Sequence, residues 1–131
     1  MIEVKKMRMT ARARFHDSIA LLKARRYDGS IYVCGYAVEI ALKARICKHL
    51  KWPGYPESSK EFQNYQSFKT HNFGTLLSLS GVEGMIRAKY LDEWSAVAQW
   101  EPEMRYREAG SATQQDAELM LDAARTLLSK L

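Results

Sequence analysis

The longest apolar stretch of the chain covers residues 31–38, where every position is apolar or glycine. It lies in a segment, residues 29–50, that runs for about five turns without a helix breaker. Its β-branched residues allow a strand, but the length favours a helix that is buried on all sides. We therefore predict a central helix with Ser30 as its N-cap. Gly35 lowers helix propensity by roughly 1 kcal/mol, which predicts the close approach of a neighbouring backbone.

Apolar residues at helical spacing predict three or four further helices around the central one. Residues 1–9 either extend the first of these helices or are loose. The last helix begins at Ser111 or Thr113, with Gln114 or Asp116 in capping-box position. The expected helices cover residues 10–26, 70–79 (capped by Thr70) and 85–99, and the segment from about 114 almost to 131. The sequence thus predicts an all-α, antiparallel up-and-down bundle of four to five helices. We expect a single domain, residues 1–131, with one long loop at about 51–70.

Composition removes several classes of protein. The longest apolar run is far shorter than the roughly 20 residues of a membrane span, and the start MIEVKKMRM does not resemble a signal peptide. Cys34 and Cys47 are thirteen residues apart on the central helix, too far along its axis to form a disulfide. These features predict a cytoplasmic protein with core thiols and no membrane association.

The net charge of +5 is unevenly distributed. Residues 1–51 contain 12 Lys and Arg against 4 Asp and Glu, a balance of +8, whereas residues 52–131 contain 8 against 11, a balance of −3. A basic surface on the first half would attract phosphates, and a solvated helix face explains it equally well. The aromatic residues of the 51–70 loop leave a similar choice between stacking on bases and pinning the loop to the core.

Searches for standard sites give nothing: the chain has no Gly-rich phosphate loop, CxxC pair, HExxH or GxSxG motif. We predict no metal and no cofactor. Three polar residues remain in informative positions. Glu39 directly follows the apolar run and needs a cation, His71 lies at a predicted helix start, and Arg105 follows a Trp-Glu-Pro turn.

These residues belong to strings that occur in the same order in a known family. The strings are Tyr32-Val-Cys-Gly-Tyr-Ala-Val-Glu-Ile-Ala-Leu-Lys-Ala44, then Thr70-His-Asn-Phe-Gly-Thr-Leu-Leu77, then Trp100 with Glu103-Met-Arg-Tyr106. The chain resembles the HEPN domain family over about residues 10–130. The resemblance implies an antiparallel four- to five-helix bundle that forms a homodimer and binds nucleotides or RNA. Many members are RNases in toxin–antitoxin or defence systems, often encoded beside a small nucleotidyltransferase.

The chain departs from the family's catalytic motif, an Arg and a His separated by about four to six intervening residues. Arg105 matches the Arg, but Gly110, Ser111 and Ala112 occupy the stretch where the His is expected. A metal-independent RNase needs a base near the ribose 2′-hydroxyl as well as a cation. We therefore expect a non-catalytic module acting with a partner such as a nucleotidyltransferase.

The resemblance supplies candidate site residues for each alternative. For nucleotide or RNA binding they are Arg105, Tyr106, His71 and Lys43. Glu39 is expected to form a structural ion pair with Arg105, with Tyr106 packed over it. An RNase with a rearranged Arg105 and His71 site is one alternative, and a purely structural dimerisation or interaction module is another.

Overall fold

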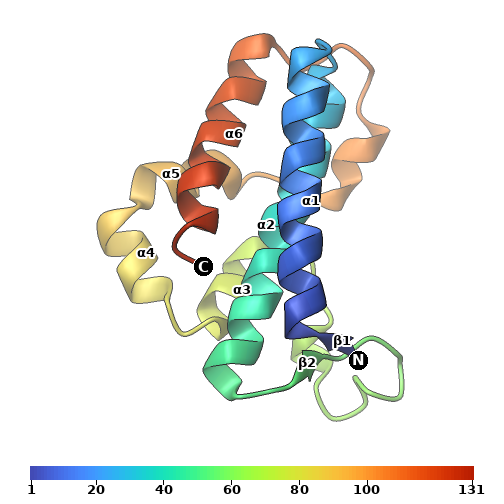
Figure 1. Ribbon diagram of the computed structural model, residues 1–131, viewed down its shortest axis with the longest axis vertical. Coiled ribbons are helices and arrows are strands. Elements are labelled where there is room, and N and C mark those ends of the chain that lie inside the picture. The colour runs from blue at the N-terminus through green and yellow to red at the C-terminus, as the bar shows by residue number, and fades with distance from the viewer.

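The computed structural model describes all 131 residues, and helices dominate it (Figure 1). The long helices are α1 (Val4–Lys23), α2 (Tyr27–Leu50) and α6 (Gln114–Leu128). The short ones are α3 (Phe73–Leu79), α4 (Glu83–Lys89) and α5 (Leu91–Val97). Two 3₁₀ helices, η1 (Gln66–Phe68) and η2 (Pro102–Tyr106), and two strands, β1 (Ile2–Glu3) and β2 (Gly54–Tyr55), complete the secondary structure. The predicted all-α class is confirmed, with six helices instead of four or five. No helix has both the length and the apolar character needed to cross a membrane.

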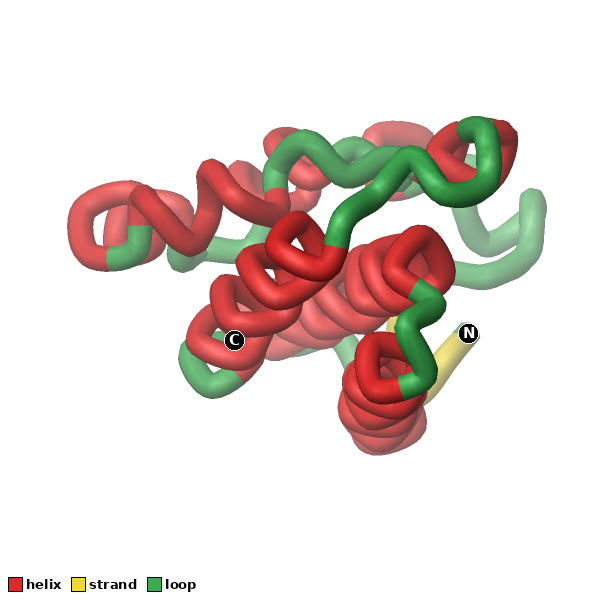
Figure 2. The backbone as a smooth tube through the Cα atoms, turned by 90° about the horizontal axis from the view of Figure 1, so that it is seen from above, coloured by secondary structure: helices red, strands yellow, loops and turns green.

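Helix α2 occupies the middle of the molecule. It packs along α1 on one side and against α6 on another, while α3 and η2 lie on the side away from α1 (Figures 1 and 2). Its buried residues include both cysteines and point in several directions around the helix axis. The uninterrupted apolar run therefore predicted the position of this helix correctly.

Helices α1 and α2 form an antiparallel hairpin. The chain reverses at residues 24–26, where Arg25 adopts a left-handed conformation with φ of 62°. The expected N-cap at Ser30 is wrong, because α2 begins three residues earlier. Ser30 is buried inside the hairpin, where its hydroxyl donates a hydrogen bond to the main-chain oxygen of Ser18 at 2.7 Å. At the other end, residues 4–9 do extend α1.

Gly35 allows a tryptophan ring to pack directly on α2. A Cβ atom at Gly35 would lie 2.0 Å from ring atoms of Trp100. The indole Nε1 donates to the main-chain oxygen of Tyr32 at 3.2 Å, and the ring stacks on Phe73 with centroids 5.2 Å apart. The close neighbour is therefore a side chain, not the backbone that the sequence led us to expect.

The long connection after α2 is fixed to the rest of the molecule by its aromatic rings. Tyr55 and Phe62 are buried, and the Tyr55 hydroxyl donates to the main-chain oxygen of Phe68. Strand β2 also pairs with β1 in antiparallel fashion. Tyr65 keeps 45% of its surface exposed and packs edge-on against Trp52. Most of the rings therefore pin the loop, which leaves few of them free for bases.

The predicted helix over residues 85–99 is divided into α4 and α5. Tyr90, at the junction, has φ of −133° and ψ of 35°, outside the helical region. Ile86 and Trp94 are both buried, one on each side of this break. Helix α3 also differs from expectation, since it is capped by Asn72 and not by Thr70.

Helix α6 begins after Thr113, one of the two N-caps that the sequence predicts. Thr113 and Asp116 form a capping box in which each side chain accepts a hydrogen bond from the other residue's backbone N–H. The segment just before it is tied to the start of α2. There the Asp28 carboxylate accepts hydrogen bonds from the backbone N–H groups of Gly110 and Ala112.

Candidate functional site

One side of α2 carries a row of polar side chains: Tyr32, Tyr36, Glu39 and Lys43. Their spacing of four, three and four residues places them along a single stripe of the helix. We call these four residues the α2 polar face. The loop before α3 brings His71 to this face, and η2 brings Arg105 and Tyr106. The three strings that carry the family resemblance therefore meet on one side of the central helix.

Glu39 is buried, with 5% of its side chain exposed, and its carboxylate contacts the Lys43 ammonium group and the His71 imidazole. Its Oε1 atom lies 2.7 Å from Nδ1 of His71, and its Oε2 atom accepts a hydrogen bond from Nζ of Lys43 at 3.4 Å. Lys43 is one helical turn further along α2, and its ammonium group also lies over the Tyr55 ring. This arrangement compensates the cost of burying a carboxylate.

The expected ion pair between Glu39 and Arg105 is not formed, and this prediction is corrected here. No carboxylate lies within 4.0 Å of the Arg105 guanidinium, which donates to the main-chain oxygen of Pro102 at 3.3 Å. The physical reason is that His71 and Lys43 contact the two carboxylate oxygens of Glu39 in place of Arg105. The sequence therefore identified Glu39 as an acid that needs a partner, but it did not identify the partner.

Arg105 and Tyr106 form an exposed stacked pair. The guanidinium carbon lies 4.6 Å from the centre of the Tyr106 ring, and 76% of Tyr106 is exposed. The neighbouring phenol groups of Tyr106 and Tyr32 raise the pKa of Arg105 above its ordinary value. Tyr106 therefore packs on Arg105 alone, not over a Glu39–Arg105 pair, and both side chains face solvent.

Tyr36 lies between Tyr32 and Glu39 on the α2 polar face. Its hydroxyl is 3.4 Å from the Tyr32 hydroxyl. Burial is the main reason that its pKa is raised to about 12, with further increases from Tyr32 and the Glu39 carboxylate and a decrease from Arg105.

His71 has the geometry of an oriented imidazole. Its Nδ1 atom faces the buried Glu39 carboxylate, while 59% of its side chain is exposed and Nε2 makes no hydrogen bond within the protein. A carboxylate in this position favours the tautomer with the proton on Nδ1, which leaves Nε2 as an acceptor. The same relation between acid and imidazole orients the base in hydrolytic triads.

Four cavities of the structure are lined by residues other than Glu39, His71 and Arg105, although one of them includes Met104, the neighbour of Arg105. Beside the buried and half-buried residues of the α2 polar face, His71, Arg105 and Tyr106 are exposed. No three His, Cys, Asp or Glu side chains come together in an arrangement that could hold a metal ion.

Sequence reasoning gave no role to two groups of residues. Tyr32 and Tyr36 were part of the motif strings, and their spacing of four residues was the signal that they share a side of α2. Arg8, Arg12 and Arg125 line a separate cavity. The spacing of Arg8 and Arg12 indicates a shared side of α1, but nothing in the sequence places Arg125 beside them.

Comparison of the chain with protein-family models, with curated proteins and with solved structures gives no match in any of the three.

Proposed function

We propose that this protein is a HEPN-type helical module that binds nucleotides or RNA through the α2 polar face together with His71, Arg105 and Tyr106. In this proposal the helices form the antiparallel HEPN bundle, and the protein is a cytoplasmic, non-catalytic homodimer. It acts with a partner such as a small nucleotidyltransferase in a toxin–antitoxin or defence system.

The observation that carries the proposal is the exposed Arg105–Tyr106 stack beside Tyr32. A guanidinium without a carboxylate partner is suited to a phosphate oxygen. An exposed phenol ring next to it offers a surface on which a base can stack. His71 lies further along the same side of α2, where its exposed ring would offer a further hydrogen-bonding group to the nucleic acid, while the mostly buried Lys43 is bonded to Glu39.

Binding to a fluorescent single-stranded RNA, measured by anisotropy, tests the proposal. Replacing Arg105 or Tyr106 by Ala should weaken binding by about tenfold, because each removes a contact worth about 1–3 kcal/mol. Arg87→Ala is the matched control, since Arg87 is an exposed arginine on α4 that is paired with Glu83. If ATP, GTP and short RNA at millimolar concentration all leave the melting temperature unchanged, the proposal is wrong.

The Glu39–His71 pair favours a second candidate function, a metal-independent RNase. His71 Nε2 would take the proton from a ribose 2′-hydroxyl as the 2′-oxygen bonds to phosphorus and the bond to the 5′-oxygen breaks. The leaving oxygen takes a proton from solvent, and Arg105 offsets charge on the phosphate. The products are a 2′,3′-cyclic phosphate and a 5′-hydroxyl end.

The test for this activity is cleavage of RNA in the presence of EDTA. His71→Ala should abolish cleavage, and Glu39→Gln should slow it, because the imidazole loses its orienting carboxylate. Cleavage that survives His71→Ala would assign the activity to another group or to a contaminant. A protein that binds RNA but never cleaves it supports the first proposal alone.

A further inference from the structure

A cavity of about 490 Å³, which we call the aromatic cavity, lies where the chain leaves α2 and strand β2 pairs with β1. None of its lining residues is a lysine or an arginine, and none belongs to the α2 polar face. The complete lining is Met1, Trp52, Gly54, Pro56, Glu61 and Tyr65. The volume is within the range of small-molecule sites, about 300–1,000 Å³.

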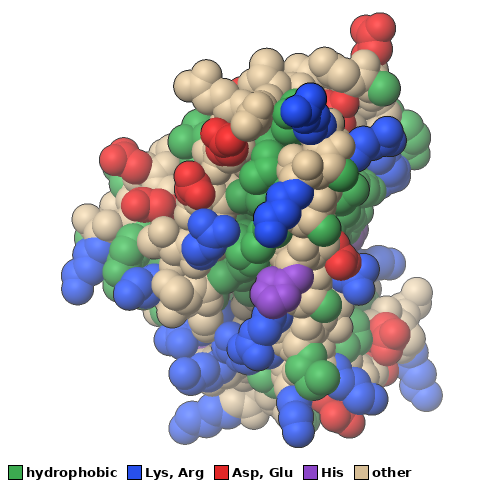
Figure 3. Space-filling model, turned by 45° about the horizontal axis from the view of Figure 1, so that its top comes forward, with side chains coloured by type: hydrophobic (Ala, Val, Ile, Leu, Met, Phe, Trp, Pro, Cys, Tyr) green, Lys and Arg blue, Asp and Glu red, His purple; other side chains and the backbone are tan.

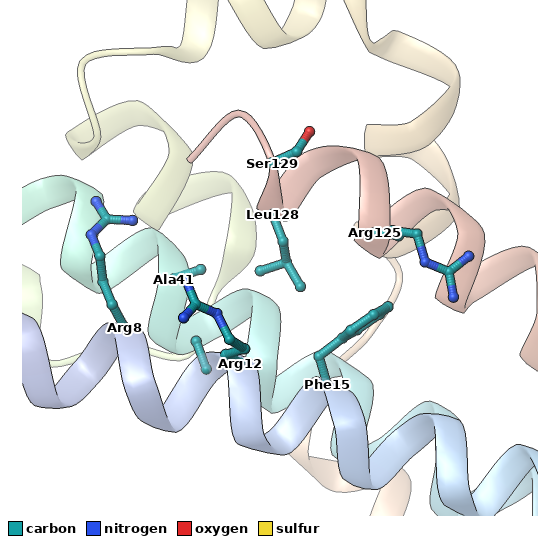
Figure 4. Close-up of a pocket in the computed structure, with 8 residues that line it drawn as sticks. Arg8, Arg12, Phe15, Ala41, Arg125, Leu128 and Ser129 are labelled. Carbon is teal, nitrogen blue, oxygen red and sulfur yellow. The ribbon is translucent and has the colours of Figure 1, made fainter.

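The charge of this cavity contrasts with that of the molecule as a whole. The chain has a net charge of +5, and Figure 3 shows Lys and Arg side chains crowded over the lower part of one face. The cavity between α1 and α6 is lined by arginines, of which Arg8 and Arg125 lie at opposite ends with their guanidinium groups turned outward (Figure 4). In the aromatic cavity, by contrast, the only charged side chain of the lining is that of Glu61.

Two aromatic rings form a corner in this cavity. The rings of Trp52 and Tyr65 have centroids 5.2 Å apart and planes inclined at 68°, so their faces meet at an angle. Phe68 packs against both rings, with centroids 4.9 Å from Trp52 and 6.2 Å from Tyr65, and this contact holds the corner in place. Tyr65 keeps 45% of its surface exposed, which leaves the corner accessible from solvent. Aromatic faces carry negative partial charge and attract cations.

Glu61 adds a full negative charge whose hydrogen bonds are already made. The α-ammonium group of Met1 donates to its Oε1 atom at 2.7 Å, and the main-chain N–H of Glu57 donates to its Oε2 atom at 2.8 Å. The Met1 ammonium is the main reason that the pKa of Glu61 is lowered, so this carboxylate is ionised at neutral pH. The same ammonium lies 3.7 Å from the Glu57 carboxylate, so two carboxylates face one cation. A ligand therefore meets negative charge but few unused acceptors, which favours a cation that has no N–H group to satisfy.

We propose that the aromatic cavity binds a small quaternary ammonium compound such as choline, with the trimethylammonium group against the Trp52 and Tyr65 rings and beside Glu61. Such a group combines an apolar methyl surface with a positive charge, and aromatic faces match both properties. A primary ammonium group would lose hydrogen bonds to water that this cavity does not replace. The ligand is a cation and the site shares no residue with the proposed nucleic-acid site, so either proposal can fail without the other.

The test is a titration of ¹⁵N-labelled protein, at constant ionic strength, with choline and two analogues. Dimethylbutanol replaces the charged nitrogen of choline by carbon, and ethanolamine carries a primary ammonium group. We expect choline to shift the indole N–H resonance of Trp52 and the amide resonance of Gly54, and to bind about tenfold more tightly than either analogue. Tyr65→Leu and Glu61→Gln should each weaken choline binding by about tenfold. Glu118→Gln is the matched control, because Glu118 is an exposed acid on α6, and it should leave the affinity unchanged.

Four results would overturn the inference. One is the absence of shifts at these two resonances with choline in the millimolar range. Another is equal binding of choline and dimethylbutanol, which would show that the rings offer only an apolar surface. The third is tighter binding of ethanolamine than of choline, which would assign the cavity to primary amines. The fourth is tighter binding of a short peptide that contains trimethyllysine, which would assign it to a protein tail. Tyr65 and Glu61 are exposed, so both variants should keep the wild-type fold.

Discussion

Replacing Gly35 by Ala separates local helix propensity from tertiary packing, because the two predict effects of opposite sign. Within α2, propensity alone predicts that alanine stabilises the protein by about 1 kcal/mol. In the structure, the new methyl group would lie 2.0 Å from atoms of the Trp100 ring, whereas ordinary contacts begin at 3.4 Å. The ring would have to retreat by about 1.4 Å, the difference between these distances.

The surroundings of Trp100 set the cost of that retreat. The ring is 4% exposed and packs against Tyr36 and Phe73, with centroids 4.9 and 5.2 Å away. Its hydrogen bond to Tyr32, already 3.2 Å long, would be lost, at about 1 kcal/mol. Overpacking of a dense core costs about 1–3 kcal/mol more. After subtraction of the gain in propensity, we expect Gly35→Ala to lower the free energy of unfolding by about 1–3 kcal/mol.

Urea unfolding followed by circular dichroism measures this difference. Gly84→Ala on α4 is the control, because a Cβ atom there meets nothing within 4 Å. The control should gain up to about 1 kcal/mol. If Gly35→Ala is as stabilising as Gly84→Ala, then Trp100 does not pack on Gly35 and the arrangement of η2 against α2 is wrong.

Three further predictions concern groups fixed by tertiary contacts. Glu39→Ala should lower the free energy of unfolding by about 2 kcal/mol through lost charged hydrogen bonds, whereas Arg105→Ala should stay within about 0.5 kcal/mol. If urea unfolding shows an equal loss of free energy of unfolding in both variants, then Glu39 and Arg105 are paired and the structure is wrong on this point. Burial raises the pKa of Cys34 from 9.0 to about 12, so the unfolded state loses its proton first and stability should fall between these pH values. Urea midpoints should show a smaller fall in Cys34→Ala, and an identical fall would show that Cys34 is not responsible. Asp28→Ala should speed hydrogen exchange at the Gly110 amide, and unchanged protection would mean that Asp28 does not hold this segment.

The long-range parts of the candidate site were only partly predictable. The sequence identified Glu39, His71 and Arg105 as residues of interest, and the structure joins His71 to Glu39 while Arg105 donates to the main-chain oxygen of Pro102. It did not identify the partner of Glu39. Of its two partners, Lys43 is only four residues along α2 and was within reach of the helical spacing, whereas His71 is 32 residues away in sequence. The path of the loop before α3 brings Nδ1 of His71 to 2.7 Å from Oε1 of Glu39.

The sequence by itself determined the features that depend on neighbouring residues. The all-α class and the central position of α2 follow from apolar periodicity, and the capping box of Thr113 follows from side chains three residues apart. Only the tertiary structure decided which residues of different helices and loops come into contact. The Trp100 ring packs on Gly35 across 65 positions of sequence, and Arg12 and Arg125, which are 113 positions apart, line one cavity. Local sequence patterns cannot specify such contacts, because the contacts depend on how whole helices pack against one another.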